Sequence, residues 1–281
     1  MVNKYFILNA NNFGQSNEYN QAVLEGYNNG FLTSTNLCAN GEAFDNAVND
    51  ILPDCPDLGI GAQLNITKGN ALSLCYLLKE KTGEFNKNFL YYLFARKNAS
   101  VLDHIKMEFE EQLKKILEYT KVDYLTSYQE IHAIPEIFEI VCKLAKEYNI
   151  QYVQTHFEDL YFIPNLEKHL KFNYPLNLIK VMLLQQFTKQ NRITLDEYEL
   201  HSNDFMLGLN YYGMMNADTI EQGLKVLDED CIVQVDIQPM KYRNSTKDWH
   251  TREFGLSQNL TLKDTITRLG FEITSYKNLG Q

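Results

Sequence analysis

The sequence predicts an α/β fold: a single TIM-like (β/α) barrel, distorted and built from about seven strands, that spans residues 1–281. Three observations predict it. Short apolar runs alternate with longer amphipathic stretches along the whole chain, and such alternation indicates a mostly parallel sheet. No segment rich in Pro, Gly or Ser divides the chain. The 281 residues, 44% of them hydrophobic, suffice for one large core.

The expected strands are short runs rich in Val, Ile, Phe and Tyr, which favour extended structure. These runs are Tyr5–Ala10, Leu58–Leu64, Tyr124–Ser127, Gln151–Gln154, Phe205–Leu209, Cys231–Ile237 and Glu272–Tyr276. Two long excursions, Asn70–Lys97 and Phe157–Tyr174, interrupt the alternation. In a barrel such insertions form the rim around the site.

Helices are expected between the strands. In Leu102–Tyr119, apolar residues such as Ile105, Phe109 and Leu113 recur at helical spacing. Pro135 suits the first turn of another helix. The full set of expected helices is Ser16–Tyr27, Ala43–Ile51, Leu102–Tyr119, Pro135–Tyr148, Leu176–Gln190, Ala217–Leu227 and Thr261–Leu269.

Composition argues against several classes of protein. The net charge is −10, and an acidic surface repels phosphate backbones, so no nucleic-acid partner is expected. The chain has no targeting signal and no apolar run long enough to span a bilayer, which predicts a cytoplasmic protein without a membrane partner. Its five cysteines form no CxxC pair, so neither structural zinc nor a disulfide framework is expected. A P-loop, a dinucleotide fingerprint and a Gly-x-Ser-x-Gly elbow are also missing.

Side-chain amides end several of the predicted strands, where a TIM-like barrel holds its ligands. An amide can donate a hydrogen bond to a sugar hydroxyl or accept one from it. It cannot act as a general base near neutral pH, and it is a weak metal ligand. In the alternative interpretation these residues only end strands and begin turns. The amides at the strand ends are Asn11, Asn12, Gln63, Asn65, Gln154 and Gln238.

The segment Phe6–Gly14 resembles the opening of the YdjC-like carbohydrate deacetylases, a group that includes chitooligosaccharide deacetylase. Its core reads Asn-Ala-Asn-Asn-Phe-Gly here, where the family has Asn-Ala-Asp-Asp-Phe-Gly. The resemblance continues through Gly30–Leu37, Leu58–Thr67, Tyr124–Ile137, Gln238-Pro239 and Arg252-Glu253-Phe254. It implies a barrel fold, a homodimer and metal-dependent removal of acetyl groups from amino-sugar oligomers, with a divalent ion such as Mg²⁺ or Zn²⁺.

The resemblance also assigns roles to individual positions. It implies a general base at Asn11, metal ligands at Asn12 and Gln63, and a catalytic histidine at Gln238. Of the histidines expected in Tyr128–His132, only His132 is present. A divalent ion needs about three firm protein ligands, and these substitutions remove them together with the base. No metal and no cofactor are therefore expected.

The sequence thus predicts a catalytically inert, deacetylase-like protein that binds a carbohydrate or another small polar ligand. Trp249, the only tryptophan, is expected to stack on a sugar, although ordinary packing is the alternative. The positions matching family catalytic residues are Asn11, Gln238 and Arg252, and the expected ligand contacts are Asn12, Gln63, Asn65, Gln129, Glu130, His132 and Trp249.

Two alternatives stay open. The first is an active amino-sugar deacetylase or other hydrolase with a rewired site. Glu130 and His132 lie two residues apart and could face the same way, and His156, Glu158 and Asp159 follow another strand. The second is an oligomeric interaction protein, in which the interface matters more than the pocket.

Overall fold

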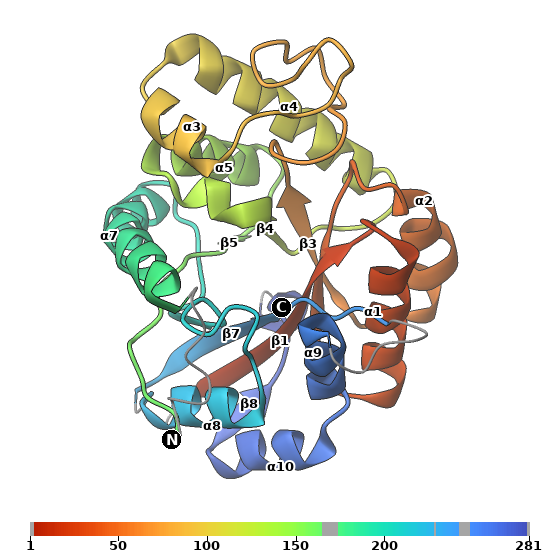
Figure 1. Ribbon diagram of the computed structural model, residues 1–281, viewed down its shortest axis with the longest axis vertical. Coiled ribbons are helices and arrows are strands. Elements are labelled where there is room, and N and C mark those ends of the chain that lie inside the picture. Colours follow the sequence, from red (N-terminus) through yellow and green to blue (C-terminus); the bar gives the residue numbers. More distant parts are fainter. Residues whose placement is uncertain (1–2, 165–173, 228, 242–247, 280–281) are drawn as a thin grey trace.

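A curled sheet of eight parallel strands, surrounded by helices, forms the fold in the computed structural model (Figure 1). The structure describes residues 3–164, 174–227, 229–241 and 248–279. Seven strands follow the order β5-β4-β3-β2-β1-β7-β6, and β8 pairs with β1 beside this path. An isolated parallel bridge between Tyr152 and His201 brings the β5 edge next to the segment that leads into β6. The expected α/β, distorted TIM-like barrel is confirmed.

The strands agree closely with the predicted runs, and two of them have the predicted bounds. They are β1 (Lys4–Phe13), β2 (Ser34–Leu37), β3 (Gly59–Leu64), β4 (Tyr124–Ser127), β5 (Tyr152–Val153), β6 (Phe205–Leu207), β7 (Cys231–Ile237) and β8 (Phe271–Ile273). The sequence prediction missed β2. Its residues read Ser-Thr-Asn-Leu, and all four are buried. The barrel interior beside this strand is polar, so the strand needs no apolar pattern, and a search for apolar runs does not find it.

The predicted strand Glu272–Tyr276 was wrong at its end. Strand β8 stops at Ile273, and Tyr276 begins the short helix α11 (Tyr276–Leu279). The cause lies in the pairing of β1. Its first three residues, Lys4 to Phe6, pair with β8, but from Asn9 onward β2 occupies the same side. A longer β8 would have no partner there.

The α-helices also match the prediction, and three additional α-helices appear within the described ranges: α3 (Phe89–Ala95) in the first excursion, α9 (Trp249–Ser257) and α11. Part of the second excursion, residues 165–173, lies outside the described residues. Among the residues that the structure describes, no helix has the length and apolar character needed to cross a membrane. The other helical segments are α1 (Asn17–Asn29), α2 (Phe44–Asn46), η1 (Ala47–Ile51), η2 (Leu52–Asp54), α4 (Ala99–Leu117), η3 (Tyr128–Ala133), α5 (Pro135–Glu147), α7 (Tyr174–Glu197), α8 (Ala217–Lys225) and α10 (Leu260–Arg268).

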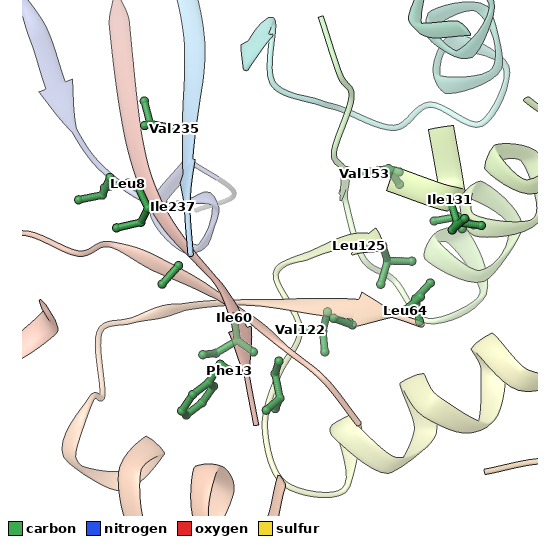
Figure 2. Close-up of a cluster of buried hydrophobic side chains, with 14 of the residues drawn as sticks. Leu8, Phe13, Ile60, Leu64, Val122, Leu125, Ile131, Val153, Val235 and Ile237 are labelled. Atoms are coloured by element: carbon green, nitrogen blue, oxygen red, sulfur yellow. The ribbon is translucent and has the colours of Figure 1, made fainter. Parts of the chain in front are cut away.

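The main core lies between the outer face of the sheet and the helices. Side chains alternate between the two faces of a strand, so Phe6, Leu8 and Ala10 of β1 join this outer layer. Figure 2 shows part of the layer, with side chains from β1, β3, β4, β5 and β7. The inner face of β1 contributes Ile7, which packs in a separate cluster with three tyrosines. The barrel therefore has an aromatic floor inside.

Tyr124 is one of these inner tyrosines, and it crosses the barrel above Gly61. A Cβ atom at Gly61 would overlap the Tyr124 ring, so glycine is required there by close approach. The Tyr124 hydroxyl donates to Asn9 Oδ1 at 2.7 Å. This bond joins the aromatic floor to a polar layer above it.

A buried carboxylate fastens the first excursion to helix α4. Glu108 is fully buried. Its Oε1 accepts the backbone N–H of Leu72 at 3.0 Å and its Oε2 that of Ser73 at 2.8 Å. Gln112, one turn later, donates to Glu108 at 2.7 Å. The excursion thus depends on one acidic side chain for its position at the rim of the barrel.

Replacing this carboxylate should destabilise the protein. Glu108→Ala leaves the N–H groups of Leu72 and Ser73 without acceptors, and we expect a loss of about 2–4 kcal/mol in the free energy of unfolding. Urea denaturation measures this. The control is Glu111→Ala on the same helix, which removes only a half-exposed ion pair with Lys114 and should change stability by less than about 0.5 kcal/mol. Equal effects of the two changes would contradict this role.

Candidate functional site

A cavity of about 650 Å³ opens at the carboxyl ends of the strands. This volume is typical of a small-molecule site. Polar residues from the ends of β1, β3, β4 and β7 form much of its wall, as expected for a barrel of this type. The lining residues are Asn11, Asn12, Gln63, Asn88, Phe89, Leu90, Thr126, Ser127, Tyr128, Gln129, Glu130, Gln154, His156, Lys180, Leu209, Tyr212, Asp236 and Gln238.

The floor of the cavity is built around the carboxylate of Asp236, which the sequence analysis had not selected. Four side-chain amides donate to it. Asn9 and Gln234 reach Oδ1 at 2.9 and 2.6 Å, and Asn11 and Gln154 reach Oδ2 at 3.2 and 3.3 Å. A carboxylate offers about four acceptor positions, so the protein fills them all.

This environment determines the ionisation of Asp236. Burial raises the pKa of the carboxyl group, and the four amide N–H groups act in the opposite direction. A protonated carboxyl would need an acceptor for its own O–H, yet all four neighbours present N–H donors. The geometry therefore favours the carboxylate form. The amides supply dipoles but no positive charge, so the negative charge remains at the cavity floor.

An irregularity in β1 brings both Asn11 and Asn12 to the cavity. Consecutive strand residues normally point to opposite faces, but the pairing of β1 with β2 shifts register between Ala10 and Phe13. Asn12 there has a φ of 71°, a left-handed conformation that asparagine tolerates better than most residues. The bulge thus turns Asn12 toward the side on which Asn11 already lies.

Asn12, Gln63 and Gln238 lie close together at one side of the cavity. The backbone N–H of Asn12 donates to Gln63 Oε1 at 3.1 Å, and its side-chain Nδ2 donates to Gln238 Oε1 at 3.4 Å. The thiol of Cys38 also donates to Gln63 Oε1, at 2.8 Å. Asn12 Oδ1 is buried and has no hydrogen-bond partner among the residues that the structure describes. It is an unused acceptor in a residue that lines the cavity.

His132, the histidine expected to contact the ligand, does not line the cavity. It is fully buried, with Nδ1 at 2.6 Å from Ser127 Oγ and Nε2 at 2.9 Å from the carbonyl oxygen of Gln154. A carbonyl only accepts, so Nε2 carries the proton and Nδ1 accepts from the Ser127 hydroxyl. Burial lowers the pKa of His132 to about 4. The ring is therefore neutral, and both its nitrogens are occupied.

Gln129 and Glu130 line the cavity from a kink in η3, where both have a φ of 56°. Glu130 forms an ion pair with Lys180 of α7. His156 also lines the cavity, and burial lowers its pKa well below the usual value. Its ring packs edge-on against His132, with centroids 4.9 Å apart. Of the pair Glu130 and His132, only the glutamate reaches the cavity.

Three expected residues lie elsewhere. Asn65 is buried, and its side chain bonds within its own loop and to Asn40. Arg252 is exposed and donates to the Gly213 carbonyl at 3.4 Å. Trp249 packs against Tyr212, with ring centroids 5.5 Å apart, and lines a smaller neighbouring cavity. Asn65 and Arg252 are thus placed for structural rather than ligand contacts.

The acids after β5 do not join Glu130. Glu158 is fully buried and accepts the backbone N–H groups of Gly208, Leu209 and Asn210 at 3.1, 2.8 and 2.7 Å. Burial raises the pKa of Glu158 to about 7. The side chain fastens the loop after β6, which supplies Leu209 and Tyr212 to the cavity.

Glu253 is a second acid that the sequence analysis missed. It lies on α9, is nearly fully buried, and accepts the backbone N–H of Gln238 at 2.7 Å. Burial raises the pKa of Glu253 to about 8. With Asp236 and Asn11 it lines a water-sized cavity of about 20 Å³ next to the large one. The period-two alternation of Gln234, Asp236 and Gln238 could have revealed Asp236. The Arg252-Glu253-Phe254 stretch of the family resemblance contains Glu253, but its contact with Gln238 is not visible in the sequence.

This barrel, with its polar cavity at the strand ends, is that of a carbohydrate-deacetylase-like protein. The YdjC-like protein family model matches residues 5–241, and the chain belongs to this family. It is 33% identical over 199 residues to a carbohydrate deacetylase from Clostridium beijerinckii, covering 69% of this chain and 78% of that protein. A crystal structure of a "putative cellobiose-phosphate cleavage protein" from Enterococcus faecalis superposes with a TM-score of 0.76 at 19% identity, covering 99% of both chains. That likeness supports the fold alone.

The residues present do not fit the divalent ion that the family resemblance implies. Asn12 and Gln63 offer neutral amides, which are weak ligands for such an ion. His132 has both ring nitrogens occupied. Across the described ranges no three His, Cys, Asp or Glu side chains come together as a group that could hold a metal.

The raised pKa of Glu253 should make stability depend on pH. The folded protein keeps this proton up to about pH 8, while the unfolded chain loses it near pH 4.5. The native state binds more protons between these values, so this carboxyl makes stability fall as pH rises through that window. In Glu253→Gln we expect the fall between pH 5 and pH 8.5 to be smaller by on the order of 3 kcal/mol.

Urea unfolding at several pH values tests this expectation. The control is Glu272→Gln, which changes an exposed glutamate on β8 and should leave the pH profile as it is. A profile for Glu253→Gln that overlays the wild-type profile would show that Glu253 loses its proton at an ordinary pH.

Proposed function

We propose that this protein binds a carbohydrate or a similar small polar ligand in the large cavity and lacks metal-dependent deacetylase activity. The observation that carries the proposal is the set of amides in the cavity wall. There, amides at Asn11, Asn12, Gln63 and Gln238 occupy the positions that the resemblance assigns to a base, two metal ligands and a catalytic histidine. The shape of a polar site is kept, and its acid–base groups are replaced.

Two further features support binding without metal chemistry. Positioned proton transfer needs a group that exchanges a proton near neutral pH, and a side-chain amide does not. Asp236 remains as an acid at the floor, but its four acceptor positions are taken by Asn9, Asn11, Gln154 and Gln234. With no acceptor position left free, it is a poor ligand for an ion.

A second candidate function is metal-independent hydrolysis. It is favoured by one observation: Asp236 and Glu253 line the same small cavity beside the main one, and burial raises the pKa of both. Two carboxyl groups with different environments can serve as acid and base. The rewired set built on Glu130 and His132 is not favoured, because His132 does not line the cavity and both its ring nitrogens are occupied.

A homodimer and a cytoplasmic location remain proposals. Leu90 and Phe94 lie four residues apart on α3 and are 58% and 85% exposed, so this face is a candidate for pairing. Sizing chromatography with light scattering would report the oligomeric state. The interaction-protein alternative would gain support from a stable oligomer that shows no ligand response.

The main proposal predicts binding without turnover. We expect no acetate release from N-acetylglucosamine oligomers, with or without added Mg²⁺ or Zn²⁺. We expect sugar oligomers to raise the melting temperature, because a ligand at 100 times its Kd stabilises the folded state by about 2.7 kcal/mol. Asn12→Ala should reduce this shift, while Gln21→Ala, an exposed amide on α1, should not. Metal-dependent acetate release that disappears in Asn12→Ala or Gln63→Ala would overturn the proposal.

The carboxyl pair gives a separate prediction. If the protein hydrolysed a sugar derivative in the presence of EDTA, Asp236→Asn and Glu253→Gln should each lower the rate by roughly 10²–10⁴-fold, and Glu272→Gln should not. Under the main proposal the wild-type protein shows no such rate. Product analysis after prolonged incubation with EDTA decides between the two functions.

A further inference from the structure

The unused acceptor of Asn12 and the charge of Asp236 lie in one cavity, and together they restrict the ligand. Asn12 is 3% exposed, and within the described ranges its Oδ1 has no hydrogen-bond partner. A buried acceptor without a partner costs roughly 1–3 kcal/mol in folding. A ligand that places a donor against this oxygen recovers that cost, whereas a ligand that places a carbonyl oxygen there meets a second acceptor.

The charges that line the cavity add to this preference. In the described part of the chain the charged lining residues are Asp236, Glu130 and Lys180. Glu130 and Lys180 pair with each other, so Asp236 leaves the lining with a net charge of −1. The imidazole of His156 also lines the cavity, and its environment keeps it neutral. No unpaired cation therefore balances the carboxylate within this lining.

Hydrogen bonding does not cancel that charge. The four amides that donate to Asp236 have no net charge, and they hold the carboxylate in place at the floor of the cavity. A cation in the cavity is attracted across a medium that is less polarisable than water. The ligand does not need to hydrogen-bond to Asp236 itself, because the attraction acts over several ångströms.

We propose that the cavity selects a sugar that carries a free ammonium group over the corresponding N-acetylated or neutral sugar. The ammonium group has three donors and no acceptor, so it matches both the unpaired Asn12 Oδ1 and the charge of Asp236. An acetamido group in the same place presents a carbonyl oxygen and has no charge. This inference rests on the proposed function, because it requires that the cavity binds a sugar.

Three β-1,4-linked disaccharides test the inference, because they differ only at C2. The disaccharide of glucosamine carries ammonium, its di-N-acetyl form carries acetamido, and cellobiose carries hydroxyl. Binding of each is measured by isothermal titration calorimetry at pH 7, in low salt and with EDTA. We expect the glucosamine disaccharide to bind about tenfold more tightly than the other two.

Binding of the three disaccharides to the wild-type protein distinguishes failure of this inference from failure of the sugar-binding proposal. If the acetylated or the neutral disaccharide binds as tightly as the ammonium form or more tightly, this inference is overturned and the sugar-binding proposal stands. If none of the three binds, the sugar-binding proposal fails as well.

Asp236→Asn provides a second readout. It removes the charge with little change in size, so the ammonium sugar should lose its advantage over cellobiose when both are measured on the variant. The matched control is Asp264→Asn, an exposed aspartate on α10, which should keep the preference. A preference that survives Asp236→Asn in a folded variant, judged by its circular dichroism, would contradict the role of this carboxylate.

Discussion

The site depends on one carboxylate, Asp236, held in the barrel by four side-chain amides. Asn9 and Asn11 come from β1, Gln234 shares β7 with Asp236, and Gln154 follows β5. The parallel register places Asn9 beside Asp236, so this donor reaches the carboxylate directly from the adjacent strand. A partly buried carboxylate is tolerated only when donors surround it, and here the sheet supplies them.

The same interaction makes the neighbouring substitutions mutually dependent. Asn11 Nδ2 lies 3.2 Å from Asp236 Oδ2. The aspartate that the family resemblance places at position 11 would put a second negative charge at that distance, and like charges so close cannot both ionise without cost. The amide at Asn11 and the acid at Asp236 therefore fit together. A return to the family residue at position 11 alone would not rebuild a metal site.

Other buried acids support the walls of the cavity. Glu108 holds the first excursion, Glu158 holds the loop after β6, and Glu253 holds the segment after β7. In each case a buried carboxyl group accepts backbone N–H groups of an irregular segment, which would otherwise lack partners. The barrel thus places its neutral amides in the cavity and uses its buried acids to shape the surrounding loops.

The sequence by itself determined the fold class, most of the strands and the family. Alternation of apolar runs and helical stretches is a local property, and the motifs from Phe6 to Gln238 can be read along the chain. It also predicted that amides would gather at the strand ends, since parallel strands end on one side. Asn11, Asn12, Gln63 and Gln238 do line the cavity.

Only the tertiary structure decided which polar residues line the cavity. His132 turns away because Ser127 and the Gln154 carbonyl occupy its nitrogens, and Glu253 comes to Gln238 from a helix that the prediction had missed. The sequence analysis did not predict strand β2, because this strand faces a polar part of the barrel interior and carries no apolar pattern. Hydrogen-bond partners distant in sequence decide these outcomes, and no local pattern encodes them.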